Sequence, residues 1–212
     1  MDAEVFRAWI VSAAEVIEAN RDHLTQLDAA IGDADHGINL ARGFTAVLGA
    51  LDAAPAKPVT PGAILTLTGN TLISKVGGAS GPLYGTAFRR AGKSLGDAAD
   101  VDLPALSAAL DAALAGVQQL GAAREGDKTM VDALAAATRA FSKAIAEGAA
   151  PDDALASLAG AAEAGAVATI PMQALKGRAS YLGPRSVGHE DPGAVSTALI
   201  LGALRDAARA GQ

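Results

Sequence analysis

The amino-acid sequence predicts an all-α protein, an antiparallel up-and-down barrel or bundle of about eight helices. Apolar residues recur every three or four positions through most of the chain, as they do along the buried face of a helix. Residues that favour strands are few and do not alternate with polar ones, so no strand is expected. The connections between the periodic segments are short, and short connections place consecutive helices side by side in opposite directions.

The first half of the chain contains four predicted helices. The first follows a single apolar stripe. The third begins with Thr60 as N-cap and Pro61 in the first helical position, where the missing N–H of proline costs nothing. The second and fourth are periodic segments between breaks rich in glycine or proline. We expect these helices over residues 5–27, 37–51, 60–76 and 83–95, with a loop at 53–58.

The second half contains four more, and prolines mark most of their starts. Asp102 precedes the proline of the fifth helix, Pro151 opens the seventh, and the turn 191–193 opens the last. The sixth begins at Asp127 or Lys128, after a break rich in glycine and charge. We expect these helices over residues 102–120, 127–146, 151–175 and 191–208.

Composition and charge narrow the classes of function. The chain has 212 residues, of which 50% are hydrophobic, and this predicts one buried core and a single domain over residues 1–212. Cysteine is absent, which excludes a disulfide framework and a thiolate zinc site. The net charge of −6 disfavours nucleic acid and anionic membranes as partners. The sequence shows neither a signal peptide nor an apolar run long enough to span a membrane, so we expect a cytoplasmic protein.

The unusual loops are predicted to meet at one end of the bundle. If consecutive helices alternate in direction, the loops that follow the first, third, fifth and seventh helices lie on the same side. Those four loops contain much of the glycine and charge outside the helices. Their sequences are IGDADHG, GGASGP, GAAREGD and KGRASYLGPRSVGHE. A functional site is therefore expected at that end.

Three aspartates, Asp28, Asp33 and Asp35, predict a metal site in the first of these loops. Asp28 follows Leu24 by four residues, so it continues the buried stripe at the C-terminal end of its helix. A carboxylate there opposes the helix dipole by ~0.3–1 kcal/mol, and burying it unpaired costs far more. A divalent cation bound by all three would resolve both costs. Oxygen ligands without cysteine favour Mg²⁺, with Ca²⁺ or Mn²⁺ as alternatives.

A second interpretation of this loop is purely structural. Asp33 and Asp35 are residues that cap helices and form Asx-turns, and they would do so at the start of the second helix. An EF-hand does not fit. Counted from Asp33, the sixth position is Ile38 rather than glycine and the twelfth is Phe44 rather than glutamate.

The stretch 77–81 is a candidate phosphate loop. A glycine-rich turn before a helix exposes backbone N–H groups to an anion, and Ser80 adds a hydroxyl donor. The alternative is an ordinary turn between helices. Four basic residues of the neighbouring loops could balance phosphate charge, namely Lys128, Lys176, Arg178 and Arg185. A P-loop at 87–94 is rejected, because Ala87 stands where the motif requires glycine and no strand precedes it.

The histidines and one methionine permit two interpretations each. His23 lies within the first helix and is expected at the surface. His36 adjoins the aspartates and is expected to contact phosphate. His189 either belongs to the site or fixes the loop before Asp191, and Met130 either lines a base pocket or packs in the core.

Four motifs resemble one known family. The stretches GDADHGINL, GGASGPLYG, GDKTMVDAL and GRASYLGPRSVGHEDPGA are similar to motifs of the nucleotide-binding L subunit of bacterial dihydroxyacetone kinase, and they occur in the same order. A similar domain forms the C-terminal half of single-chain, ATP-dependent dihydroxyacetone kinases. The resemblance covers nearly the whole chain. It implies an antiparallel eight-helix barrel that holds ADP or ATP at one end, with two Mg²⁺ ions between three aspartates and the phosphates.

Carried over residue by residue, the resemblance implies a complete binding site. Asp28, Asp33 and Asp35 would be the metal ligands, and no residue of this chain would act as catalytic acid or base. Ala79 stands where the family often has a hydroxyl residue, so no side-chain hydrogen bond is expected there. The residues implied to surround the nucleotide are His36, Gly37, Ile38, Asn39, Ala79, Ser80, Gly121, Met130, Arg178, Asp191, Pro192 and Gly193.

The resemblance also implies partners. A separate K subunit would hold dihydroxyacetone covalently on a histidine and receive the phosphoryl group. An M subunit of the phosphotransferase system would rephosphorylate the bound ADP in place. Three alternatives stay open: an L-type domain serving another acceptor such as a different ketose or a fatty acid, a non-catalytic regulator that binds a transcription factor, and a metal-dependent phosphohydrolase.

Overall fold

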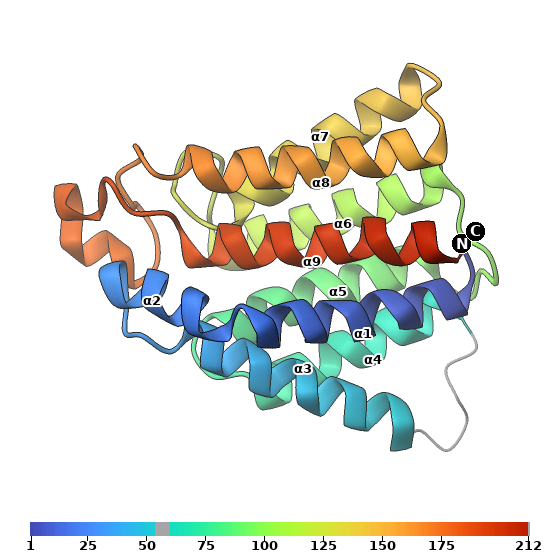
Figure 1. The fold of residues 1–212 in the computed structure, drawn as a ribbon, viewed down its shortest axis with the longest axis horizontal. Helices are drawn as coiled ribbons and strands as arrows, with labels where there is room; N and C mark the ends of the chain where they lie inside the picture. The colour runs from blue at the N-terminus through green and yellow to red at the C-terminus, as the bar shows by residue number, and fades with distance from the viewer. Residues whose placement is uncertain (54–59, 212) are drawn as a thin grey trace.

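The computed structural model describes residues 1–53 and 60–211, and in this part of the chain it is all-helical, as predicted (Figure 1). It contains nine α-helices, one 3-10 helix and no strand. The loop expected at 53–58 falls outside the described residues, except that Ala53 ends a helix. The elements are α1 Ala3–Ala19, α2 Arg21–Ile31, α3 His36–Ala53, α4 Pro61–Lys75, α5 Ser80–Leu95, α6 Leu103–Gly121, α7 Met130–Ala146, α8 Pro151–Ala168, the 3-10 helix η1 Arg178–Ser186 and α9 Pro192–Ala210.

The first predicted helix is divided into two. Asn20 ends α1 and precedes α2 with a backbone outside the helical region, and its side-chain amide donates to the carbonyl of Val16 at 2.8 Å. This local bond competes with helix propagation, as asparagine commonly does. The apolar stripe nevertheless continues across the break, because Leu24 is still fully buried.

The seventh predicted helix ends seven residues early, and the loop after it is partly helical. α8 ends at Ala168, and Thr169 turns its hydroxyl back to the carbonyl of Ala166 at 2.6 Å. Pro171 follows, and the residue before a proline avoids helical backbone. The sixth helix begins slightly late, because Thr129 and Asp132 form a capping box that places the first helical residue at Met130.

The core collects the few aromatic side chains. Trp9 lies at its centre, with its ring 5.8 Å from that of Phe6 and 5.7 Å from that of Phe88. Its indole N–H donates to the carbonyl of Ile200 at 2.8 Å, which ties α1 to α9. Buried apolar residues from all nine described α-helices form one continuous cluster, to which α2 contributes Leu24.

Small residues allow the helices to approach closely. A Cβ added at Gly62 of α4 would lie 2.2 Å from the carbonyl oxygen of Gly96, and one at Gly92 of α5 would lie 2.6 Å from that of Gly62. No real side chain fits at such distances. Glycine at positions 62 and 92 is therefore what lets α4 and α5 pack backbone to backbone.

The alternating helices bring four loops to one end of the molecule, as predicted, while both chain termini lie at the other end (Figure 1). The loops of that end are residues 32–35, 76–79, 122–129 and 169–191, which follow α2, α4, α6 and α8. Within the described residues, none of the helices combines the length and apolar character that a bilayer crossing requires.

Candidate functional site

A cleft of about 380 Å³ opens among the four loops. It is lined by the end of α2, the starts of α5, α7 and α9, and the segment leading into η1. Acidic, basic and apolar side chains all contribute to it. A cleft of this composition suits a charged ligand that also carries an apolar part.

The three aspartates meet at one side of this cleft. Each of Asp28, Asp33 and Asp35 offers a carboxylate oxygen, and these oxygens lie within 4.8 Å of one another. Asp28 is buried at the end of α2, whereas Asp33 is exposed on the loop. Hard oxygen donors gathered in this way fit a divalent cation such as Mg²⁺.

The loop is built to hold the carboxylate of Asp28 in place. Its Oδ2 accepts the backbone N–H groups of Asp35 at 2.9 Å and His36 at 3.2 Å, at the start of α3. Ala34 turns the chain with a positive φ of 61°. A Cβ at Gly32 would lie 2.0 Å from Oδ1 of Asp28, so only glycine leaves room for this arrangement.

The start of α3 is capped by a different aspartate from the two that the structural interpretation proposed. Asp28, from the preceding helix, supplies the side-chain oxygen that accepts the N–H of His36, the first residue of α3, and that of Asp35 just before it. Asp33 instead pairs with Arg178 of η1, with Nε 3.0 Å from Oδ2. Arg178 is the cation that the structure places against the acidic cluster.

The N-terminus of α5 also lines the cleft. Ala79 occupies the N-cap position and gives no side-chain cap, so backbone N–H groups of the first turn are available to an anion. Gly78 supplies the turn with a φ of 65°. Gly81 allows close contact with α4, since a Cβ there would lie 2.4 Å from the carbonyl of Val76. The loop is therefore both a tight helix connection and a potential anion site.

His36 links this N-terminus to α9. Its Nδ1 lies 3.1 Å from Oγ of Ser80, and its Nε2 lies 2.8 Å from Oγ of Ser196. Burial lowers the pKa of His36 to about 4, against the opposing charge of Asp28, so the ring is neutral at pH 7. The hydroxyl of Tyr84 lies 2.7 Å from Oγ of Ser196 and extends the network into the core.

Most residues implied by the resemblance line this cleft. Gly37, Ile38 and Asn39 do not: Gly37 lies against α2, Ile38 is 50% exposed, and Asn39 accepts a hydrogen bond from Arg42 at 2.8 Å. The implied residues that line the cleft are Asp28, Asp33, Asp35, His36, Ala79, Ser80, Gly121, Met130, Arg178, Asp191, Pro192 and Gly193.

Met130 and Asp191 lie together at the start of α7 and α9. Met130 is buried, and it lines both the cleft and an apolar cavity below it, so the two interpretations of this residue are compatible. Asp191 caps α9 by accepting the N–H of Ala194 at 2.7 Å, and burial raises the pKa of its carboxyl to about 7. A Cβ at Gly193 would lie 3.5 Å from that of Met130, so these two segments are in contact.

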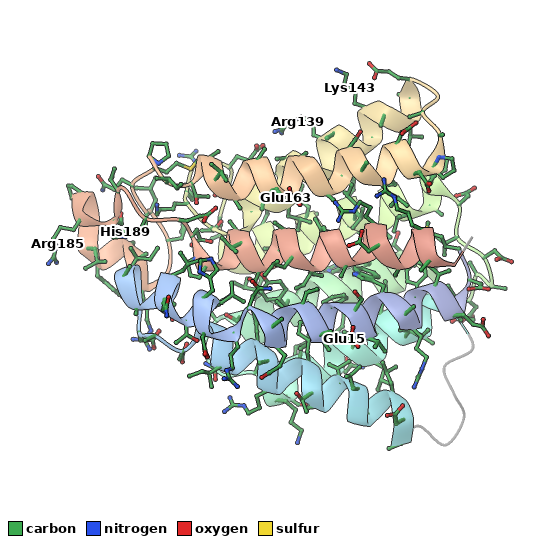
Figure 2. The ribbon with its side chains drawn as sticks, viewed as in Figure 1. Glu15, Arg139, Lys143, Glu163, Arg185 and His189 are labelled. Carbon is green, nitrogen blue, oxygen red and sulfur yellow. The ribbon has the colours of Figure 1, made fainter. Side chains whose placement is uncertain are left out.

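The basic residues of the loops divide into two groups. Lys176 and Arg178 line the cleft, whereas Arg185 projects away from the molecule at the tip of η1 (Figure 2). Lys128 also lines the cleft, but it is buried, and its ammonium donates to the carbonyls of Thr169, at 2.7 Å, and His189. The side chain of His189 is exposed, and only its carbonyl takes part in this contact.

Comparison with known proteins agrees with this architecture. The family model described as "DAK2 domain" matches residues 30–206. The chain is 41% identical over 201 residues, 95% of each protein, to the "PEP-dependent dihydroxyacetone kinase, ADP-binding subunit DhaL" of Escherichia coli (strain K12). It is 40% identical to the "PTS-dependent dihydroxyacetone kinase, ADP-binding subunit DhaL" of Lactococcus lactis, covering 92% of this chain and 93% of that protein. The "Triokinase/FMN cyclase" of Rattus norvegicus is 40% identical over 86% of this chain and 31% of its own length.

Two solved structures share the fold. Both are of the dihydroxyacetone kinase of C. freundii. The native form has a TM-score of 0.72 and 27% identity, and the complex with AMP-PNP and Mg²⁺ has a TM-score of 0.70 and 29% identity. Each match covers 97% of this chain and 34% of the other, so the chain corresponds to about one third of that longer kinase.

Proposed function

The chain belongs to the DAK2 domain family, and from this membership we propose that it is the nucleotide-binding subunit of a dihydroxyacetone kinase. Its relatives are kinase subunits and triokinases, which are phosphotransferases. One observation carries the proposal: a cluster of three carboxylates and an uncapped helix N-terminus line the same cleft. Acidic ligands for a cation and N–H donors for an anion are the two requirements of a magnesium–nucleotide complex.

Different residues of the cleft would bind the metal and the phosphates. Asp28, Asp33 and Asp35 would hold Mg²⁺, two ions as the family resemblance implies, and the metal supplies charge compensation at phosphate oxygens when it is bound. The first turn of α5 and the hydroxyl of Ser80 would hold the phosphate chain. His36, neutral and fixed between two serines, would orient that hydroxyl.

The base end of the nucleotide would lie toward α7 and α9. Met130, with Gly193 against it, offers an apolar surface, and Gly121 leaves space beside Leu83. Arg178 pairs with Asp33 at the mouth and is 70% exposed, so it can reach a terminal phosphate. No side chain here needs to accept a proton, because the acceptor hydroxyl would belong to another subunit.

We propose partners on the same basis. The relatives described as ADP-binding subunits of PEP-dependent and PTS-dependent kinases support a K-type subunit that presents dihydroxyacetone and an M-type subunit that rephosphorylates bound ADP. In this scheme the nucleotide acts as a bound coenzyme. A transcriptional regulator would be a further partner of this protein.

Reconstitution tests the proposal. The purified protein is combined with a K subunit, dihydroxyacetone and either ATP or a phosphorylated M subunit, and dihydroxyacetone phosphate is measured by coupled oxidation of NADH. We expect product only when the K subunit is present, and faster with the M subunit than with ATP.

Other outcomes of this experiment would support one of the three alternative functions. Product from a different ketose or a fatty acid carrier in place of dihydroxyacetone would show another acceptor. Loss of γ-phosphate without any acceptor would show a phosphohydrolase. Tight ADP binding without transfer to any acceptor would support the non-catalytic regulator.

A further inference from the structure

We infer that Lys128 is a positioning residue for nucleotide binding: its buried ammonium holds the end of α8 and the loop before α9 against the start of α7. It acts through these segments and does not bind the phosphates. The inference rests on the proposed function, since it concerns how the same cleft keeps its shape.

The position of Lys128 is unusual for a lysine. The residue is 1% exposed, although its side chain lies beside a cleft that is open to solvent. Its backbone has a φ of 61°, a left-handed conformation that residues other than glycine seldom adopt. A chain would not retain a strained, buried cation unless the surrounding groups required it.

The partners of the ammonium are backbone carbonyls of two other segments. It donates to the carbonyl of Thr169 at 2.7 Å, where α8 ends, and to that of His189, two residues before Asp191. The last carbonyls of a helix have no partner within it and carry the negative end of its dipole, so a cation is favourable there. Figure 2 shows His189 at the same end of the molecule as η1.

Neighbouring contacts make these segments one unit. The N–H of Asp191 donates to Oγ1 of Thr169 at 2.9 Å, and the N–H of Leu175 donates to the carbonyl of Asp127 at 3.1 Å. Met130 follows Lys128 by two residues and contacts Gly193. The ammonium therefore fixes the distance between the two walls of the cleft that α7 and α9 provide.

A phosphate contact is the competing role, and the geometry disfavours it. An ammonium has three N–H donors, and protein carbonyls already take two of them. Lys176 and Arg178 line the same cleft with accessible side chains, and they are better placed to meet a mobile anion. Lys128 differs from both in being buried and in joining segments that are far apart in the sequence.

The absence of cysteine permits a sharp test. Lys128→Cys is unfolded and alkylated with 2-bromoethylamine, which builds a thioether analogue of lysine, or with iodoacetamide, which leaves a neutral side chain. Both forms are refolded, and MgADP affinity and helicity are measured by calorimetry and circular dichroism. We expect the neutral form to bind about tenfold more weakly or worse, and the aminoethyl form to regain affinity within about threefold of identically treated wild-type protein.

Lys143→Cys is the matched control. This lysine is exposed at the far end of α7, and neither alkylated form should change affinity (Figure 2). Unchanged affinity in the neutral Lys128 form would overturn the inference, and so would equal weakening in both Lys128 forms. If the neutral form does not regain helicity, the aminoethyl form decides. Recovery of helicity and of affinity within about threefold of wild-type protein supports the inference, and a loss of about tenfold or more in a folded aminoethyl form refutes it. Failure of untreated wild-type protein to bind MgADP would refute the proposed function, and this inference with it.

Discussion

At the scale of single residues, the cleft depends on a few groups whose surroundings change their ordinary behaviour. Gly32 leaves room for the carboxylate of Asp28, and burial keeps the ring of His36 neutral. Asp33 is the most exposed of the three acidic residues and pairs with Arg178. It is therefore the position at which the metal assignment can be tested with the least disturbance to the fold.

We expect Asp33→Asn to remove most of the effect of magnesium on nucleotide binding. The amide is isosteric with the carboxylate but carries no charge, so it is a much weaker Mg²⁺ ligand. ADP affinity measured by calorimetry with and without Mg²⁺ should differ at least tenfold for wild-type protein and should be nearly equal for the variant. Asp111→Asn, at an exposed site on α6, serves as the control. Equal magnesium dependence in all three proteins would contradict the metal assignment.

Asp191 gives a prediction about pH. Burial raises the pKa of its carboxyl from the ordinary 3.8 to about 7, so between these values the folded protein binds a proton that the unfolded chain releases. The resulting stabilisation is complete below the unfolded pKa and is lost as pH rises through the folded pKa. Asp191→Asn keeps an oxygen for the N–H of Ala194 but does not titrate.

Urea unfolding of both proteins without nucleotide, from about pH 4 to about pH 8, measures this effect. The free energy of unfolding of the wild type relative to Asp191→Asn should fall with rising pH, by on the order of a few kcal/mol. Groups that do not interact with Asp191, such as His36, contribute equally in both proteins and cancel in the difference, so the difference reports Asp191 together with the charges coupled to it. Parallel curves would show that Asp191 is ionised throughout.

Some of these residues could be predicted from the sequence, and others could not. Carboxylates beside an apolar stripe are unusual, so the sequence alone indicates that Asp28 and its neighbours form a site. Tyr84, Ser196 and the buried carbonyl contacts of Lys128 left no such signal. A hydroxyl among apolar residues looks like any core position until it is known which helices face each other. The ligand roles that the resemblance implies for the site residues stay predictions.

At the scale of elements, the periodicity of apolar residues predicted that each helix exists. The places where helices break or end depend on local hydrogen bonds and on proline, which periodicity does not show. The apolar stripe of the first predicted helix is real, but Asn20 interrupts it with a bond to Val16 that periodicity does not reveal. The predicted seventh helix extends past the end of α8 because apolar residues continue to Leu175, whereas Pro171 disfavours helical backbone at the residue before it. Both errors leave the direction of the chain unchanged, which is why the loop positions were still predicted correctly.

Two substitutions of glycine by alanine should change stability in opposite directions, one at the contact between α4 and α5 and the other at an open position of α8. Gly92→Ala would place a Cβ 2.6 Å from both the carbonyl oxygen of Gly62 and Oγ1 of Thr66, so we expect a loss of about 2 kcal/mol or more in the free energy of unfolding. Gly160→Ala in α8 meets nothing within 4 Å and should gain about 0.5–1 kcal/mol from helix propensity. Chemical denaturation of both variants measures the contrast. Similar shifts in both would show that α4 and α5 are free to separate.

At the scale of the whole molecule, one end carries the chemistry and the helices hold it together. The buried core runs along the helices, and a single domain remains the prediction for the chain. Ligand binding should therefore affect first the loops that line the cleft, because a ligand bound there contacts them directly.

We expect MgADP to slow hydrogen exchange at one end only. Amides in residues 32–35, 76–79, 122–129 and 169–191 should be protected, whereas the turns at 96–102 and 147–150, at the other end, should exchange as before. Exchange followed by mass spectrometry, with and without MgADP, makes the comparison. Protection spread evenly over both ends would place the nucleotide elsewhere or indicate a global stabilisation.

The two chain termini meet far from the cleft. The amino group of Met1 donates to the carbonyl of Val101 at 2.8 Å, and a Cβ at Gly211 would lie 2.8 Å from Cγ2 of Val5. A tether or reporter attached to either terminus therefore leaves the opening unobstructed, so the protein can be immobilised with its mouth toward the bulk solution. The same closeness allows a short splice to join the two termini, and the far-end turn at 147–150 then offers a place to open a circularly permuted chain.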